Sequence, residues 1–180
     1  MWKQSLILLT LLSFPSLSQP FYTPIRAAIG GELGGVSPQF SVTANVATAY
    51  RKRSFLDIQA GLGWLDRAGF KSPSFSAAGT YCFLLNPYNK KACTPQPGYN
   101  FVEIYLEGGL AALLLDPYDN NRFVNDDLQH QFATPLALGG LQFHLVSRKW
   151  IYRLKIRCTP ALIKSKYASI AGLGVGIGWR

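Results

Sequence analysis

The sequence predicts an all-β protein, an eight-stranded antiparallel up-and-down transmembrane β-barrel that follows a cleaved signal peptide. The first observation behind this prediction is that apolar and polar residues alternate with a period of two along most of the chain. The second is that charged residues make up only 15% of the chain, against about 25% in soluble domains. The third is that aromatic residues reach 13%. A protein with this composition needs surroundings other than water for its outer face.

The N-terminal segment has the order of a secretory signal peptide. Lys3 precedes an apolar stretch from Leu6 to Leu12, and small serines follow it. The stretch is shorter than the roughly 20 residues of a membrane-spanning helix. We therefore expect residues 1–18 to be a signal peptide and residues 19–180 to form the barrel.

Six segments alternate clearly and two less cleanly (25–33 and 141–145), and all eight are predicted as strands. Each strand has roughly nine to twelve residues, which matches the ~9–11 that a tilted strand needs to cross a bilayer. Turn residues (Gly, Pro, Asn, Asp and Ser) separate most of them. Pro135 weakens the prediction at the start of the sixth strand, because proline cannot donate to a sheet. The alternating cores are 25–33, 40–51, 56–64, 75–83, 102–110, 141–145, 150–159 and 171–179.

One face of every predicted strand is apolar, and its aromatic residues lie near the strand ends. Rings in this position are typical of the girdles at two membrane interfaces. In chain order the apolar face carries Ile25, Ala27, Ile29 and Leu33; Phe40, Val42, Ala44, Val46 and Tyr50; Leu56, Ile58, Ala60, Leu62 and Trp64; Phe75, Ala77, Tyr81 and Phe83; Val102, Ile104, Leu106 and Leu110; Leu141, Phe143 and Leu145; Trp150, Tyr152, Leu154, Ile156 and Cys158; and Ala171, Leu173, Val175, Ile177 and Trp179.

The opposite face carries small residues and isolated charges of both signs. Small residues suit the narrow interior of an eight-stranded barrel, and mixed charges suit an internal network in which each charge finds a partner. The four alternating glycines from Gly172 to Gly178 leave room for long side chains. Because the fifth and seventh strands flank the sixth, we expect Glu103 and Glu107 to reach the cations of the seventh. The predicted lumen charge network is Arg26, Glu32, Asp57, Glu103, Glu107, Arg153, Lys155 and Arg157.

The signal peptide Met1–Ser18, the eight alternating segments over residues 24–180 and the final strand Tyr167–Arg180 resemble those of the small bacterial outer-membrane β-barrel proteins. The resemblance implies a bacterial outer-membrane location, with both termini in the periplasm and the loop 116–131 extracellular. It also implies outer-membrane lipids, lipopolysaccharide and the barrel assembly machinery as partners. Members of the group commonly end in an aromatic residue, whereas here Arg180 follows Trp179.

The remaining reactive residues predict little chemistry. Export to an oxidising compartment makes Cys82 and Cys93 a candidate disulfide, whereas Cys158 is expected to be a free buried thiol. No Cys/His spacing is typical of a metal site. The polar residues between the fifth and sixth strands are expected to form a solvated turn and not a calcium site. They are Asp116, Asp119, Asn121, Asp126 and Asp127. We expect no metal and no cofactor.

The sequence therefore predicts a non-enzymatic barrel with a filled lumen and a structural, adhesive or ligand-binding role through its surface loops. No catalytic residue is predicted, and the scattered positive charges do not indicate nucleic acid. One alternative is a lipid-acting barrel enzyme, which requires His144 beside a serine and a carboxylate at the membrane rim. The other is a secreted lipocalin-like barrel that binds an apolar ligand, which requires the Leu56, Ile58, Leu62 and Trp64 face to point inward.

Overall fold

The computed structural model describes residues 25–67, 70–86, 101–115, 133–147, 149–163 and 168–179. The predicted signal peptide lies outside these residues. The described part of the chain contains no helix that is both long enough and apolar enough to cross a membrane.

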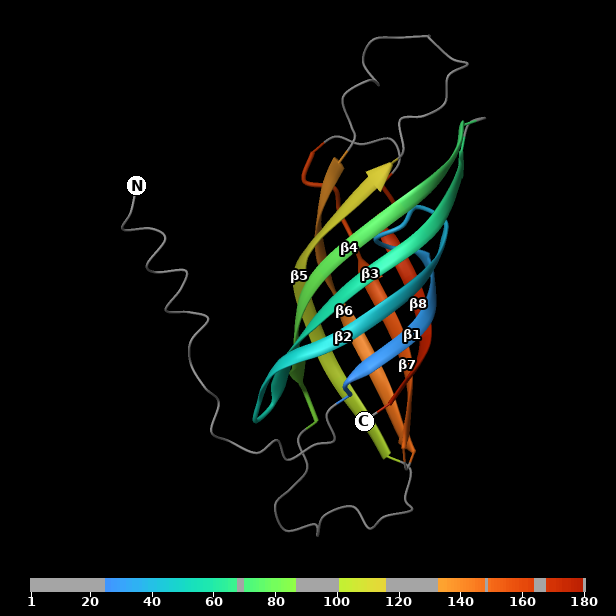
Figure 1. Ribbon diagram of the computed structural model, residues 1–180. Coiled ribbons are helices and arrows are strands. Elements are labelled where there is room, and N and C mark those ends of the chain that lie inside the picture. The colour runs from blue at the N-terminus through green and yellow to red at the C-terminus, as the bar shows by residue number, and fades with distance from the viewer. Residues whose placement is uncertain are drawn as a thin grey trace, which may run out of the picture.

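Eight antiparallel strands close into a barrel in which each strand pairs with its neighbours in the sequence and β1 pairs with β8 (Figure 1). The predicted all-β, eight-stranded antiparallel barrel is thus confirmed. Closure gives every strand a neighbour on both sides, apart from strand ends such as the start of β6. The strands are β1 (Ala27–Gly34), β2 (Phe40–Arg51), β3 (Ser54–Arg67), β4 (Phe70–Leu84), β5 (Phe101–Leu115), β6 (Ala133–Ser147), β7 (Trp150–Cys158) and β8 (Ala171–Trp179).

The sixth strand begins earlier than its alternating core predicts and includes Pro135. Strand β7 pairs with β6 only from Gly139 onward, so the start of β6 pairs in register with β5 alone. Proline is tolerated there because an edge position needs no donor on its open side. The chain after β7 covers this side, since Ala137 N donates to the Pro160 carbonyl and Leu162 N to the Pro135 carbonyl, both at 3.0 Å.

The apolar face of the strands points out of the barrel. Leu110 is 64% exposed, Leu62 62% and Val175 60%, although each lies in the middle of a strand or close to it. Aromatic side chains project outward at two levels. Phe40, Trp64 and Phe75 lie towards one end of the barrel, and Phe83, Trp150, Tyr152 and Trp179 lie towards the other.

Inside, the barrel is filled by three layers, with an apolar cluster at each end and polar side chains between them. We call the end where β1 begins and β8 ends the terminal end. The terminal apolar cluster consists of Ile25, Ala28, Ala47, Phe55, Cys82, Leu84, Tyr105, Val146 and Ile151. The opposite apolar cluster consists of Val36, Leu65, Ala78, Ala111, Leu113, Leu115, Leu136 and Leu138.

Tyr50 was predicted on the outer face, and the structure shows that this is wrong. The β2–β3 register shifts between Thr48 and Arg51, and Ala49 has a positive φ of 49°. This β-bulge adds one residue to β2 and reverses the faces that follow it. Tyr50 therefore packs against the terminal apolar cluster, while Arg51 is exposed.

Replacing Tyr50 with phenylalanine should lower the free energy of unfolding by about 1 kcal/mol. The Tyr50 hydroxyl lies 2.5 Å from the Ile25 carbonyl oxygen and 2.9 Å from that of Ala47, so it ties the residue before β1 to β2. Phenylalanine keeps the ring but loses both bonds. Urea unfolding of the refolded barrel measures the difference. An unchanged midpoint would contradict this role for the hydroxyl.

Candidate functional site

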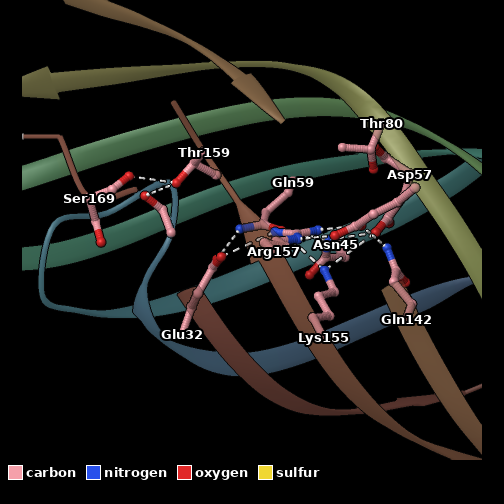
Figure 2. Close-up of polar contacts among 12 residues, drawn as sticks. Glu32, Asn45, Asp57, Gln59, Thr80, Gln142, Lys155, Arg157, Thr159 and Ser169 are labelled. Carbon is pink, nitrogen blue, oxygen red and sulfur yellow. Dashed lines mark hydrogen bonds and ion pairs between the residues drawn. The ribbon is translucent and has the colours of Figure 1, made fainter. Parts of the chain in front are cut away.

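The charge network lies in the middle layer of the lumen and is built from β7. Alternate residues of this strand, Arg153, Lys155 and Arg157, point inward because of the two-residue period. Their register partners on β8 are Gly176, Gly174 and Gly172, which have no side chains to occupy the same space. The three cations therefore extend across the lumen towards β1, β3 and β5 (Figure 2).

Arg157 is the most heavily bonded of the three cations. Its Nε lies 2.5 Å from Glu107 Oε1 and its Nη2 lies 3.0 Å from Glu107 Oε2, which gives a bidentate pair. Its Nη1 lies 3.3 Å from Glu32 Oε1 and donates to Gln59 Oε1 at 2.7 Å. The side chain is completely buried. Arg157 thus joins three strands that are far apart in the sequence.

Asp57 is the acceptor shared by the other two cations. Its Oδ2 lies 2.6 Å from Arg153 Nη2 and 3.5 Å from Lys155 Nζ. Asn45 Nδ2 donates to the same oxygen at 3.1 Å. All of these side chains are buried. Asp57 therefore balances two charges that would be very costly in the lumen without a carboxylate.

Neutral amides connect the two halves of the network. Gln59 Oε1 accepts from Lys155 at 3.1 Å as well as from Arg157, and Gln59 Nε2 donates to Glu32 at 2.8 Å. Gln142 accepts from Arg153 at 2.8 Å and donates to Glu107. Figure 2 shows Gln59 and Gln142 in one group with Glu32, Lys155 and Arg157 inside the barrel. These amides were not predicted as part of the network, although they occupy the same inward phase as the charges.

The structure brings six of the predicted network residues into direct ion pairs: Glu32, Asp57, Glu107, Arg153, Lys155 and Arg157. Glu103 is also buried, and it accepts a hydrogen bond from the Tyr105 hydroxyl at 2.8 Å. Of the two β5 carboxylates that were expected to reach the cations of β7, Glu107 forms an ion pair with Arg157. The ion pairs of Arg153 and Lys155 are formed with Asp57 across the lumen.

Arg26 does not lie in the lumen. It is exposed, and the preceding Ile25 is buried instead. Both residues come before β1, where the alternation has not yet begun. The Ile25 side chain turns in over the space left by Gly178 and joins the terminal apolar cluster. This corrects the prediction that Arg26 is part of the charge network.

The cysteines also differ from their predicted states. The predicted Cys82–Cys93 disulfide involves a residue outside the described part of the chain, and Cys82 itself is a free thiol in the lumen, where Gln142 Nε2 lies 3.4 Å from its sulfur. The Cys82 side chain points inward because Cys82 belongs to the inward-facing set of alternate residues in β4. Cys93 lies outside the described residues. Cys158 is free but exposed on the outer face, not buried as expected.

His144 is buried at the terminal end of the network. Its Nε2 lies 3.1 Å from Gln142 Oε1, and its ring centre lies 4.7 Å from that of Tyr105. It therefore does not occupy the membrane-rim position that the enzyme alternative requires. The five polar residues considered for calcium lie outside the described residues.

The network leaves little free space. A cavity of about 10 Å³ lies beside Gly30, Gly174 and Gly176 and is also lined by Glu32 and Lys155. This is room for roughly one water molecule. The two apolar clusters lie on either side of this network along the barrel.

Comparison with one solved structure supports the fold. The chain is similar to the N-terminal β-barrel domain of Pseudomonas aeruginosa OprF, with a TM-score of 0.52, 15% sequence identity, and coverage of 85% of this chain and 93% of that one. It is also similar to a de novo designed transmembrane β-barrel, with a TM-score of 0.43, 14% identity, and coverage of 88% and 97%. No family model matches the sequence. No curated protein matches it significantly.

Proposed function

We propose that this chain is an integral barrel of the bacterial outer membrane that has no catalytic activity. It serves as a sealed structural anchor whose loops at the end opposite the termini make adhesive or ligand contacts. In this orientation the termini face the periplasm, and the segment 116–131 faces outward. Outer-membrane lipids, including lipopolysaccharide, surround the barrel, and the barrel assembly machinery inserts it.

The observation that carries the proposal is the outer wall of the barrel. In the described strands, no Asp, Glu, Lys or Arg side chain points outward between the two aromatic levels. Apolar side chains that are exposed or partly exposed instead cover that zone on all eight strands. A continuous apolar belt of this kind far exceeds the patches that a soluble monomer exposes. Lipid is the solvent that suits it, because the closed barrel also pairs its backbone groups internally.

The lipocalin-like alternative is not supported. Ile58, Leu62 and Trp64 are each at least half exposed and point outward, and the lumen that they would have to line is polar. An apolar ligand entering that space would displace the ion pairs of Asp57 and Arg157. The interior therefore acts as packing for the barrel and not as a binding pocket.

Two measurements on the expressed full chain test the proposal. We expect the protein in the outer-membrane fraction, released only by detergent, with faster gel mobility before boiling than after it. In a planar bilayer the purified barrel should give no steady conductance, because both mouths are closed by apolar clusters. Protein that is soluble in buffer would refute the membrane location, and a stable ohmic conductance would refute the sealed lumen.

An epitope test addresses the orientation. An epitope inserted after Asn121 should be accessible to antibody on intact cells, whereas one inserted after Lys52 should need permeabilised cells. The reverse pattern would show that the barrel lies in the membrane the other way round.

A further inference from the structure

The basic side chains that the structure describes as exposed all lie at the terminal end of the barrel. From this placement we infer that the terminal end binds the phosphate groups of anionic phospholipids through a basic rim. The rim consists of Arg26, Arg51, Lys52, Arg53 and Lys149. This inference rests on the proposed membrane location and adds a lipid preference that the fold alone does not imply.

The five basic residues share one end of the barrel because of the strand order. Arg51, Lys52 and Arg53 lie in the turn between β2 and β3, Lys149 lies in the turn between β6 and β7, and Arg26 precedes β1. All five side chains are exposed. Since β2–β3 and β6–β7 lie on opposite sides of an eight-stranded closed sheet, the basic residues surround the mouth of the barrel.

Acidic residues are placed elsewhere. The sequence contains nine Asp and Glu residues, of which Glu32, Asp57, Glu103 and Glu107 are buried in the lumen. Asp66 belongs to the end of β3 that is opposite the rim. The remaining four occur in the sequence after β5, which also ends opposite the rim. None of the described carboxylates is exposed at the terminal end.

The rim also lies at the right depth for lipid phosphates. Lys149 immediately precedes Trp150, whose indole is exposed and whose register partner is Trp179. Such outward rings mark the boundary between acyl chains and headgroups. A strand rises by about 3.3 Å per residue, so basic residues one or two positions further along reach the phosphate layer.

The backbone of the rim is held by the barrel. Leu84 N donates to the Arg53 carbonyl at 2.7 Å, and Arg26 N donates to the Trp179 carbonyl at 2.9 Å. The main chain at Arg26 and Arg53 is thus held near the terminal aromatic level. Multivalent attraction between several cations and anionic headgroups falls steeply with salt, which distinguishes it from apolar contact with the bilayer.

The tryptophans provide a test with an internal reference. After signal-peptide removal the chain contains Trp64, Trp150 and Trp179, of which Trp64 lies towards the opposite end. A Trp64→Phe form reports on the rim, and a Trp150→Phe/Trp179→Phe form reports on the other end. Both forms are reconstituted in phosphatidylcholine vesicles with a minor fraction of phosphatidylglycerol. In one set of vesicles the phosphatidylcholine carries brominated acyl chains, and in the other set the phosphatidylglycerol does. The bromine quenches the fluorescence of tryptophans that lie close to the brominated lipid.

We expect brominated phosphatidylglycerol to be enriched roughly fivefold over its mole fraction around the rim tryptophans, and to be near its mole fraction around Trp64. Changing all five rim cations to glutamine should remove the enrichment while quenching by brominated phosphatidylcholine persists. A matched form with Arg26→Lys, Arg51→Lys and Arg53→Lys should keep the enrichment of phosphatidylglycerol. High salt should reduce this enrichment.

Equal enrichment at both ends, or enrichment that survives the glutamine changes, would overturn the inference. So would tight binding of heparin in zwitterionic detergent without lipid enrichment, since that result would assign the rim to a soluble polyanion. If neither brominated lipid quenches any tryptophan, the barrel is outside the bilayer and the proposed membrane location fails as well. Quenching by both lipids in proportion to their amounts would overturn the lipid preference alone.

Discussion

Replacing Arg157 with methionine should lower the free energy of unfolding by about 3–5 kcal/mol. Methionine keeps an unbranched apolar side chain but removes the guanidinium that pairs with Glu107 and Glu32 in the lumen. Both carboxylates would then remain buried without this cation, and the cost of burying them uncompensated dominates the expected loss. Equilibrium unfolding in urea, with the barrel in detergent or lipid vesicles, measures the change.

The matched control is Arg53→Met, which removes the same group from an exposed position on the rim. Its effect on unfolding should stay within about 0.5 kcal/mol. Adding Glu107→Leu to Arg157→Met should recover part of the loss, because replacing both members of a buried pair with apolar groups is often nearly neutral. A loss below about 1 kcal/mol for Arg157→Met would show that the charge network does not stabilise the barrel as described.

Replacing Gly172 with alanine should destabilise the barrel by about 1–3 kcal/mol. A Cβ at this position would overlap the backbone of Gly35, whose N–H donates to the Ala171 carbonyl at 3.0 Å. Gly34 and Gly35 have φ values of 67° and 75°, so this turn adopts a backbone conformation that favours glycine and cannot readily move away. Urea unfolding again gives the measurement.

Gly174→Ala provides the comparison on the same strand. A Cβ there would meet Lys155 Cβ at 3.4 Å, which is ordinary van der Waals contact. Because alanine loses less backbone entropy than glycine on folding, this variant should be unchanged or up to about 1 kcal/mol more stable. Equal destabilisation by the two changes would contradict the close approach of Gly35 to Gly172.

The number of strands and the direction of their faces could be predicted from the sequence because period-two alternation is a local property. Ile104 and Glu103 are adjacent, and their assignment to opposite faces needs no knowledge of the partner strands. The same reasoning failed at Tyr50, where a one-residue bulge reverses the phase. It also failed at Ile25 and Arg26, since both residues precede the first strand.

The pairing of the lumen charges and the composition of the two apolar clusters depend on contacts between residues that are far apart in the sequence. Arg157 is 50 residues from Glu107 and 125 from Glu32 in the sequence, and their contact is set by the stagger of strands around the barrel. The opposite apolar cluster includes Leu113 and Leu115, which stand in an unbroken apolar run. Alternation carries no signal in such a run, so its inward residues were not distinguished from its outward ones.

The central claim is that lipid covers the apolar wall while the charged and apolar side chains of the lumen are packed away from it. The most direct test is methyl NMR of the barrel in lipid nanodiscs with a lipid-soluble paramagnetic agent. The methyl signals of Val42, Ile58 and Ile156, which point outward, should be strongly attenuated. Those of Leu113 and Ile151, which are fully buried, should be preserved. Attenuation of the buried methyls with preservation of the outward ones would contradict the account.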